Sequence, residues 1–475
     1  MTKLEWRMTK ERRMPRVRRT HKNGKKSGGH SPGAVADGTR SVPATLVRIH
    51  AVLVGAWLQS APALAGDLIP TPEFADHAIP VSMPPAPESM AWEWINVAVL
   101  IGALCLASYF ALVSRWRRGL FLLAVASLIW FGFVRDGCVC SIGATQNVVY
   151  AMSDPAYAIP ATVVLLFVLP LVFTLFFGRT FCAAVCPLGA IQEVVAVRSV
   201  RVPSWLDHAL GLVPYLYLGA AVIFAVSGTA FVICRYDPFV ALFRLSGDVN
   251  MLVFGACLLF LGLFVGRPYC RYLCPYGAIL GVLSSVAKWH AKIPPEECIQ
   301  CRLCEDSCPY GAIQEPAPPL PPEAKPAARR LLGWMLLLAP ALIAAAAGLG
   351  MLLAVPLSRL DPQVRLAERL RQEETGQVAG TTDASDAFRA TGRPVSELYQ
   401  LAVERQARFG TLGGWLGAWM GLVIGVKLVT LSVRRKRTDY QPDRSRCVSC
   451  GRCYWYCPGE QVRLGLIRDV SEVVK

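Results

Sequence analysis

Two stretches of the sequence each carry four cysteines with the same spacing. They read CIQCRLCEDSCP at residues 298–309 and CVSCGRCYWYCP at residues 447–458, with a proline directly after the last cysteine. In bacterial two-cluster ferredoxins this spacing supplies the thiolates for 4Fe-4S clusters, and the fourth cysteine of one run binds the cluster of the other run. Zinc sites usually group cysteines as separated pairs, so zinc is the weaker interpretation. We therefore predict two 4Fe-4S clusters.

The exchange of the fourth cysteine predicts which thiolates share a cluster. About a hundred residues or more separate the two runs, and two strongly apolar stretches lie between them. The chain therefore has to leave the ferredoxin domain after the first run and return to it with the second run. The predicted ligands are Cys298, Cys301, Cys304 and Cys457 for the first cluster, and Cys447, Cys450, Cys453 and Cys308 for the second cluster.

A second repeat carries two cysteines per copy. It reads GRTFCAAVCPLGAIQEVV at 178–195 and GRPYCRYLCPYGAILGVL at 266–283. Cysteines four residues apart face the same way in a helical segment, so two copies could offer four thiolates to one site, enough for a third iron-sulfur centre. Free thiols, a redox disulfide pair or a packing role at the cytoplasmic ends of membrane spans remain open as alternatives. The cysteines are Cys182, Cys186, Cys270 and Cys274.

Three further cysteines are predicted on the outer face, namely Cys138, Cys140 and Cys234. The segment CVCSIGATQN at 138–147 aligns with AVCPLGAIQE as a degenerate third copy of the repeat, which makes covalent flavin attachment to Thr145 a weak interpretation. In an oxidising compartment, these cysteines could form one disulfide and leave one thiol, or form a metal or redox site.

The composition indicates a membrane protein. The chain has 475 residues, of which 54% are hydrophobic and 17% charged, whereas soluble domains have about 25% charged residues. The net charge is +16, but residues 1–50 alone hold 13 Lys and Arg against 3 Asp and Glu. Because this basic run precedes a targeting segment, nucleic acid is not expected as a partner.

The amino-terminal region resembles a secretory signal. A short apolar core, AVLVGAWL at 51–58, is followed by APALA ending at Ala65, and such a core is too short for a span of about 20 residues. We predict a leader and signal peptide over 1–65 with cleavage after Ala65, or alternatively an uncleaved anchor. A short external segment follows over 66–93.

Seven membrane spans are predicted. Basic residues such as RWRR at 115–118 and RRKR at 434–437 follow the first and seventh spans, so these connections should face the cytoplasm. Both ferredoxin runs then lie inside. The predicted spans cover roughly 94–114, 119–134, 156–177, 209–233, 249–265, 331–357 and 410–433.

The predicted fold is mainly α: a polytopic membrane helix bundle with a cytoplasmic, bacterial-type two-cluster ferredoxin domain (α+β) that is split by a transmembrane hairpin. The external loop has helical patterns in VRLAERLRQEE and VSELYQLAVERQARF and could dock a redox partner. The predicted units are the bundle at 94–285, the first ferredoxin half at 286–330, the hairpin at 331–433 with its external loop at 358–409, and the second ferredoxin half at 434–475.

Several spans, two C-x3-C-P motifs and a terminal pair of 4Fe-4S runs together make the chain resemble the NosR and NapH polyferredoxins over roughly residues 94–460. Those membrane proteins transfer electrons for nitrous oxide and periplasmic nitrate reductases. NosR-type proteins also carry an external flavin-binding domain, and the short segment after Ala65 leaves no room for one. Flavin is therefore expected only through a partner.

The resemblance implies an iron-sulfur electron-transfer protein of the inner membrane. It would link the quinone pool or a cytoplasmic donor to an external reductase or flavoprotein, as the electron-transfer subunit of an oxidoreductase system or as a quinol dehydrogenase. Alternatives are a CcoG-like assembly factor that reduces a metal or maintains an external metalloenzyme, and a redox sensor. No predicted span interior carries any of the six histidines, so haem b is not expected.

Overall fold

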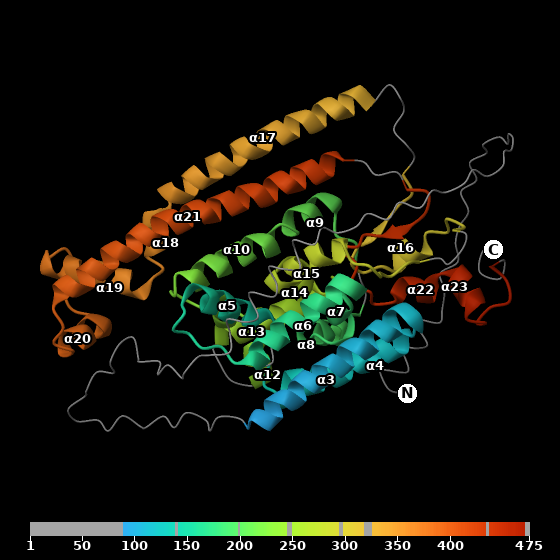
Figure 1. The fold of residues 1–475 in the computed structure, drawn as a ribbon, viewed down its shortest axis with the longest axis horizontal. Helices are drawn as coiled ribbons and strands as arrows, with labels where there is room; N and C mark the ends of the chain where they lie inside the picture. Colours follow the sequence, from blue (N-terminus) through green and yellow to red (C-terminus); the bar gives the residue numbers. More distant parts are fainter. Residues whose placement is uncertain are drawn as a thin grey trace, which may run out of the picture.

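A computed structural model describes residues 89–137, 141–197, 200–244, 249–293, 298–317, 325–433 and 437–470. The predicted leader and the predicted outer cysteines Cys138 and Cys140 lie outside these ranges. The described chain is mostly helical, and its helices run largely along one direction (Figure 1).

Five described helices are long and apolar enough to cross a membrane: Met90–Val113, Arg117–Val134, Ser204–Val226, Pro326–Leu352 and Val395–Ser432. Two shorter apolar helices, Ala161–Phe177 and Val249–Gly262, lie at the other two predicted spans. An apolar helix therefore stands at each of the seven predicted spans. Membrane crossing by the two shorter helices stays a prediction, because 17 and 14 residues fall short of the usual length.

The bundle begins with the helices α3, α4, α5 and α6. The helices α3 and α4 each continue into a π-helix, and the buried Asn96 side chain of α3 accepts a hydrogen bond from Trp130 Nε1 at 3.1 Å, which ties α3 to η2. After α5, the helix α6 ends at Gly178, whose positive φ of 71° suits a residue without a Cβ. The bounds are α3 Met90–Ser108, η1 Tyr109–Val113, α4 Arg117–Ser127, η2 Leu128–Val134, α5 Ser141–Ser153 and α6 Ala161–Phe177.

Both copies of the C-x3-C-P repeat fold in the same way. A five-residue helix carries the first cysteine, the chain breaks at the second cysteine, and a new helix begins at the proline. Proline suits this first helical position because its missing N–H has no partner there. The helices of the first copy are α7 Thr180–Ala184 and α8 Pro187–Val195, and those of the second copy are α14 Pro268–Tyr272 and α15 Pro275–Ser285.

The described part of the segment between the two copies forms five helices and packs against both copies. The helix α10 contacts α5, α15 and the hairpin helix α21, so it lies between the bundle and the hairpin. The bounds are α9 Ser204–Leu210, α10 Val213–Val226, α11 Val232–Arg235, α12 Val240–Arg244 and α13 Val249–Gly262.

The predicted hairpin consists of α17 (Lys325–Leu352) and α21 (Val395–Ser432), which run antiparallel side by side (Figure 1). Glycines let the two backbones approach closely: a Cβ at Gly417 would overlap the carbonyl oxygen of Ala346. Small residues of this kind are typical of helix contacts in membranes. Trp419 Nε1 then donates to the carbonyl of Tyr215 at 2.8 Å and fixes the hairpin to α10.

The segment between α17 and α21, which the sequence predicts to be an external loop, is helical, as its sequence pattern predicts. Val364, Leu370 and Leu398 form a small apolar core between α19 and the first turns of α21. The helix α21 has 38 residues, so one continuous element joins this loop to the apolar hairpin. The bounds of the other helices are α18 Ala354–Ser358, α19 Pro362–Glu374 and α20 Asp383–Ala390.

The two ferredoxin halves meet at the end of the molecule opposite to α19 and α20 (Figure 1). Strand β1 pairs antiparallel with β2, with Ile313 opposite Pro442, and α16 packs against α22. Segments on either side of the hairpin therefore form one unit. The bounds are α16 Leu303–Ser307, β1 Ile313–Gln314, β2 Gln441–Pro442, α22 Arg452–Tyr456 and α23 Pro458–Arg463.

Candidate functional site

The structure gathers the eight ferredoxin cysteines into two groups that match the predicted sets. Cys457, the last cysteine of the second run, has the thiols of Cys301 and Cys298 as its neighbours, and Cys304 lies beside them. Cys308, the last cysteine of the first run, lies beside Cys450 and Cys447. We call the set with Cys457 group 1 and the set with Cys308 group 2. Their role as cluster ligands stays a prediction.

The backbone curls in the same way in both runs. Gln300 and Ser449, directly before the second cysteine of each run, have positive φ values of 53° and 55°. Arg302 and Gly451, directly after that cysteine, have positive φ values of 64° and 76°. Left-handed backbone is costly for residues other than glycine and tends to occur where function demands it. Here it bends each loop round its thiols.

The thiols of group 2 line a cavity and receive backbone hydrogen bonds. Cys308 Sγ accepts from Ala312 N and Cys447 Sγ accepts from Ser449 N, each at 3.4 Å. Hydrogen bonds to sulfur are one of the factors that set the potential of a bound iron-sulfur cluster. All four cysteines of the group face this cavity: Cys308, Cys447, Cys450 and Cys453.

The described side chains do not form a ready-made site for a single metal ion. Within the described ranges, no three His, Cys, Asp or Glu side chains are close enough to hold one metal ion. A zinc ion would draw four sulfurs to within about 4 Å of one another, because each Zn–S bond is about 2.3 Å long. A four-iron cluster holds its four thiolate sulfurs farther apart than a zinc ion does, because each thiolate binds a different iron at a different corner.

Burial changes the pKa of two of these thiols. It raises the pKa of Cys304 and that of Cys447 to about 12, because a desolvated thiolate is unfavourable. Only thiolates bind metal, so cluster insertion must release protons from these buried groups.

The C-x3-C-P cysteines form a third cluster of thiols, which we call group 3. The thiol of Cys274 has Cys270, Cys186 and Cys182 as neighbours, so both copies of the repeat contribute. Cys274 Sγ accepts a hydrogen bond from Gly277 N at 3.2 Å, and Cys270 Sγ accepts one from Gln192 Nε2 at 3.4 Å. The structure thus brings together the four thiols that the sequence assigns to one site.

The two copies of the repeat brace each other reciprocally. The guanidinium of Arg179 from the first copy reaches Gly277 of the second copy, where a Cβ would lie 3.3 Å from Nη2. Arg267 from the second copy reaches Gly189 of the first, where a Cβ would lie 3.1 Å from Nη1. Arg267 also donates to the carbonyls of Cys182 and Ala183. This exchange is the mark of an approximate twofold relation.

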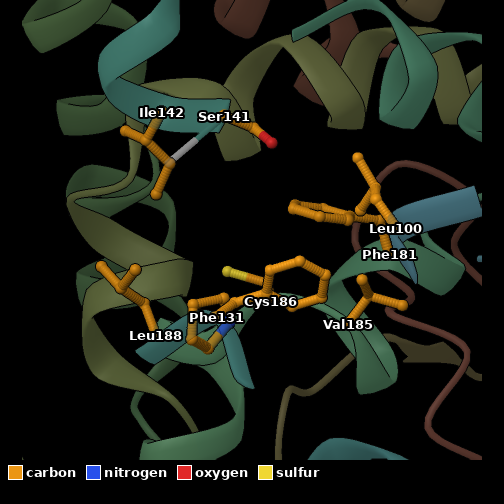
Figure 2. A pocket seen from close by; sticks show the side chains of 9 residues that line it. Leu100, Phe131, Ser141, Ile142, Phe181, Val185, Cys186 and Leu188 are labelled. Atoms are coloured by element: carbon orange, nitrogen blue, oxygen red, sulfur yellow. The ribbon is translucent and has the colours of Figure 1, made fainter. Parts of the chain in front are cut away.

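Group 3 lies deeper than the sequence predicts. The sulfur of Cys186 points into a buried apolar cavity that Leu100, Phe131 and Phe181 also line (Figure 2). Leu100 lies 13 residues before the end of η1, or about 20 Å along the helix, so Cys186 is well inside the bundle rather than at a span end. Broken backbone at such depth is tolerated only where protein surrounds it, as it does here.

A buried carboxylate joins group 3 to group 2. Glu193 in α8 contacts Arg267 at 3.3 Å, Arg117 at 3.3 Å and Arg452 at 2.8 Å, and it accepts from the Tyr310 hydroxyl at 3.1 Å. Burial opposes its ionisation, but the cations of Arg452, Arg267 and Arg117 prevail and hold the pKa of Glu193 well below its usual range. It therefore stays charged between the membrane bundle and the ferredoxin unit.

Sequence reasoning missed these supporting residues. The Gly-Arg pair that opens both copies of the repeat was a signal for Arg179 and Arg267, because both copies share it. Nothing in the sequence pointed to Glu193, because its partners come from distant segments.

Of the three predicted outer cysteines, the structure describes Cys234. Its thiol lies beside Gly143 of α5, where a Cβ would be 3.1 Å from Sγ. The predicted outer disulfide or metal site also needs Cys138 and Cys140 and stays a prediction.

The chain matches two families of iron-sulfur proteins. Residues 159–208 and 248–294 match a family described as a 4Fe-4S binding domain, and residues 291–314 match a second family with the same description. The first match contains both copies of the C-x3-C-P repeat, and the second contains the first ferredoxin run.

Two curated relatives share part of the sequence. Over 122 residues the chain is 34% identical to YccM of Escherichia coli (strain K12), which is named for a proposed role as an electron transport protein; the match covers 24% of this chain and 34% of YccM. Over 126 residues it is 34% identical to NirI of Paracoccus denitrificans (strain Pd 1222), covering 25% of this chain and 18% of NirI. The matches thus span about a third or less of these relatives. No solved structure matches.

Proposed function

We propose that this chain, a helical membrane protein with 4Fe-4S binding domains, passes electrons through the membrane to or from an external reductase or flavoprotein. The cytoplasmic side would exchange electrons with the quinone pool or a cytoplasmic donor. This matches the class of the NosR and NapH polyferredoxins, which the sequence resembles. Similarity to a relative with a proposed electron-transport role supports the same class.

The packing of group 2 cysteines against both the ferredoxin unit and the membrane bundle supports this proposal. Cys308 and Cys447 of group 2 pack against the core of the ferredoxin unit. The same two cysteines, with Cys450, also pack against the core of the membrane bundle that contains group 3. Group 2 is therefore shared between the two cores, and group 1 lies beyond it.

Two arginines lie between groups 2 and 3. The guanidinium of Arg267 is close to both Cys270 and Cys450, and that of Arg179 is close to Cys182 and Cys447. When bound, iron-sulfur clusters supply one-electron transfer. The arginines would hold positive charge between two sites that become more negative on reduction, which favours the reduced forms. Burial of both arginines keeps water out of this path.

The outer end of the proposed electron path is where the external partner would bind. The helices α19 and α20 lie at the end of the molecule opposite to the ferredoxin unit (Figure 1). We infer that they face the external compartment and dock the partner. Their surface carries both signs of charge, including ion pairs such as Arg389–Glu373, so a charged protein partner is expected.

The orientation of the chain can be tested with reporters. A reporter fused after Lys475 should be active only in the cytoplasm, and a reporter inserted near Gly380 should be active only outside, because the basic connections favour the inside. A second insertion near Asp154, in the loop before α6, serves as a matched outer control. Activity of the Lys475 fusion on the outer side would refute the proposed orientation.

Iron content tests the three groups. Anaerobically purified protein should contain about 8 Fe per chain from groups 1 and 2, and more if group 3 binds a cluster. Replacement of all four group 3 cysteines by Ser should then remove only the excess above 8. The exposed Cys257 of α13 provides the control, because Cys257→Ser should leave the iron content unchanged. Equal iron in the fourfold variant and the parent protein would rule out group 3 as a ligand set.

A further inference from the structure

Four basic residues lie together where the membrane bundle meets the ferredoxin unit. Lys288, His290 and Lys292 belong to the segment after α15, and Arg444 belongs to the second ferredoxin half. The Ser284 hydroxyl of α15 donates to the carbonyl of Arg444 at 2.7 Å, which holds the two segments side by side. The imidazole of His290 accordingly interacts with the charges of both Arg444 and Lys292. We call Lys288, His290, Lys292 and Arg444 the basic patch.

The cations of the basic patch have no counter-ion among the described residues. No described Asp or Glu side chain forms an ion pair with Lys288, Lys292 or Arg444. Asp443 directly precedes Arg444, but its carboxylate accepts from the backbone N–H of Ser445 at 2.9 Å and from the Ser445 hydroxyl at 2.7 Å. The patch therefore offers positive charge to a ligand from outside the chain.

His290 adds an unused polar atom to the basic patch. Its Nδ1 is buried and has no hydrogen-bond partner among the described residues, which is costly for a polar nitrogen. Burial, followed by the charges of Arg444 and Lys292, lowers the pKa of His290. A bound anion would act in the opposite direction and favour the protonated imidazole, in which both ring nitrogens donate.

An exposed apolar surface adjoins the basic patch. Trp289 is 48% exposed and stacks on Phe177 of α6, with ring centroids 5.3 Å apart, and Lys288 Nζ lies 4.8 Å from the centroid of the Trp289 ring. The backbone N–H groups of Lys288 and Trp289 donate to the carbonyls of Leu175 and Phe176, at 3.2 and 2.8 Å. The side chains of Leu175 and Phe176 are also exposed. Cations and apolar side chains thus form one continuous surface.

This surface lies where a membrane boundary is expected. The helix α6 stands at the third predicted span and ends at Gly178, where a Cβ would lie 3.9 Å from Oγ of Ser449, the residue before Cys450 of group 2. The end of α6 therefore meets the ferredoxin unit. Tryptophan is typical of the boundary between hydrocarbon and water, and cations are typical of its cytoplasmic side. A ligand that fits this surface carries negative charge at one end and apolar chains at the other.

From this surface we propose that the basic patch binds the phosphate head group of an anionic phospholipid, whose acyl chains lie along Trp289 and the exposed end of α6. Unpaired cations favour an anionic lipid over a neutral one. Arg444 belongs to the second ferredoxin half and Trp289 packs on α6, so this lipid would bridge the ferredoxin unit and the membrane bundle. The proposal goes beyond the proposed function, since none of the three cysteine groups depends on it.

The test is a lipid titration of full-length, anaerobically purified protein in detergent. Phosphatidylglycerol is the probe, and native mass spectrometry and the unfolding temperature report its binding. Phosphatidylglycerol should bind and raise the unfolding temperature, whereas phosphatidylcholine at the same concentration should do neither. Each cation near a membrane surface changes the affinity for anionic lipid about fivefold, so Lys292→Gln with Arg444→Gln should weaken binding of phosphatidylglycerol about thirtyfold.

Two further double variants serve as controls. Arg329→Gln with Arg330→Gln removes the same charge from two exposed residues of α17 and should keep the parent affinity. Lys292→Arg with Arg444→Lys keeps the charge of the basic patch and should also keep the affinity, which guards against misfolding. All these variants should retain the parent iron content and cluster signals, which separates this test from that of the proposed function.

Three results would overturn the proposal. The first is parent affinity for phosphatidylglycerol in the Lys292→Gln, Arg444→Gln variant. The second is an equal loss of affinity in the Arg329→Gln, Arg330→Gln variant, because the effect would then be one of overall charge. The third is equal protection by phosphatidylcholine, which carries no net charge, or by inorganic phosphate, which would make the ligand a soluble anion.

Discussion

Replacement of Cys457 by Ser should abolish the cluster of group 1 and leave that of group 2 close to normal. The thiol of Cys457 lies beside Cys298 and Cys301, although it belongs to the run that supplies Cys447, Cys450 and Cys453. A lost ligand should remove or convert about 4 Fe of the roughly 8 in the ferredoxin unit. Iron analysis and electron paramagnetic resonance of the reduced protein would measure the effect.

The matched variant is Cys308→Ser, which should instead affect group 2, because Cys308 lies beside Cys447 and Cys450. Triple replacement of Cys447, Cys450 and Cys453 provides the reference spectrum for loss of group 2. If the Cys457→Ser spectrum matched that reference, each run would close its own cluster and the shared arrangement would be wrong.

The position of Cys457 beside the first run and of Cys308 beside the second run was predictable because the spacing of the two runs indicates it. In two-cluster ferredoxins the C-x2-C-x2-C loop binds three corners of a cluster and the fourth thiolate comes from the other run, so the spacing predicts this exchange however far along the chain the other run lies. The helical hairpin between the runs was predictable from apolar length and basic flanks. The placement of Cys457 beside Cys298 and the pairing of β1 with β2 agree with both expectations.

Replacement of Glu193 by Gln should loosen the ferredoxin unit from the membrane bundle. The change leaves Arg117, Arg267 and Arg452 gathered round a neutral group, with the Arg267 side chain only 2% exposed. Removal of one partner of a buried ionic network typically costs about 3–5 kcal/mol, because the remaining charge is left uncompensated. Thermal unfolding in detergent and the rate of proteolysis at the junction between the two units should both report the loss.

Glu315→Gln is the control for this variant. Its carboxylate pairs with Arg302 at 2.8 Å, but both side chains are more than half exposed, so the change should have little effect. The Glu193 variant should also raise the reduction potential of group 2, because the uncompensated positive charge near Cys450 favours the reduced state. If Glu193→Gln left both the rate of proteolysis and the reduction potential of group 2 unchanged, the Glu193 network would not couple the ferredoxin unit to the membrane bundle.

The depth of group 3 and the role of Glu193 could not be predicted, and for related reasons. A helix that breaks at Cys186 and starts again at Pro187 can turn outwards at a membrane surface or fold back into the bundle. Only the surrounding helices decide between these paths, and here α3, α4 and α6 enclose the break. Glu193 looks like an ordinary polar residue of a helix end until Arg452, from the last segment of the chain, arrives beside it.

The split of the ferredoxin unit has a consequence for biosynthesis. If each group takes its fourth thiolate from the other half, neither cluster can be closed while the ribosome is still making α17 or α21. Both helices must first be inserted, and inserted with opposite directions, before the two halves meet. Loading with iron would then occur only in chains whose last two spans have entered the membrane correctly. A chain stalled before that point would hold open, iron-free loops and present them to the proteases that remove failed products.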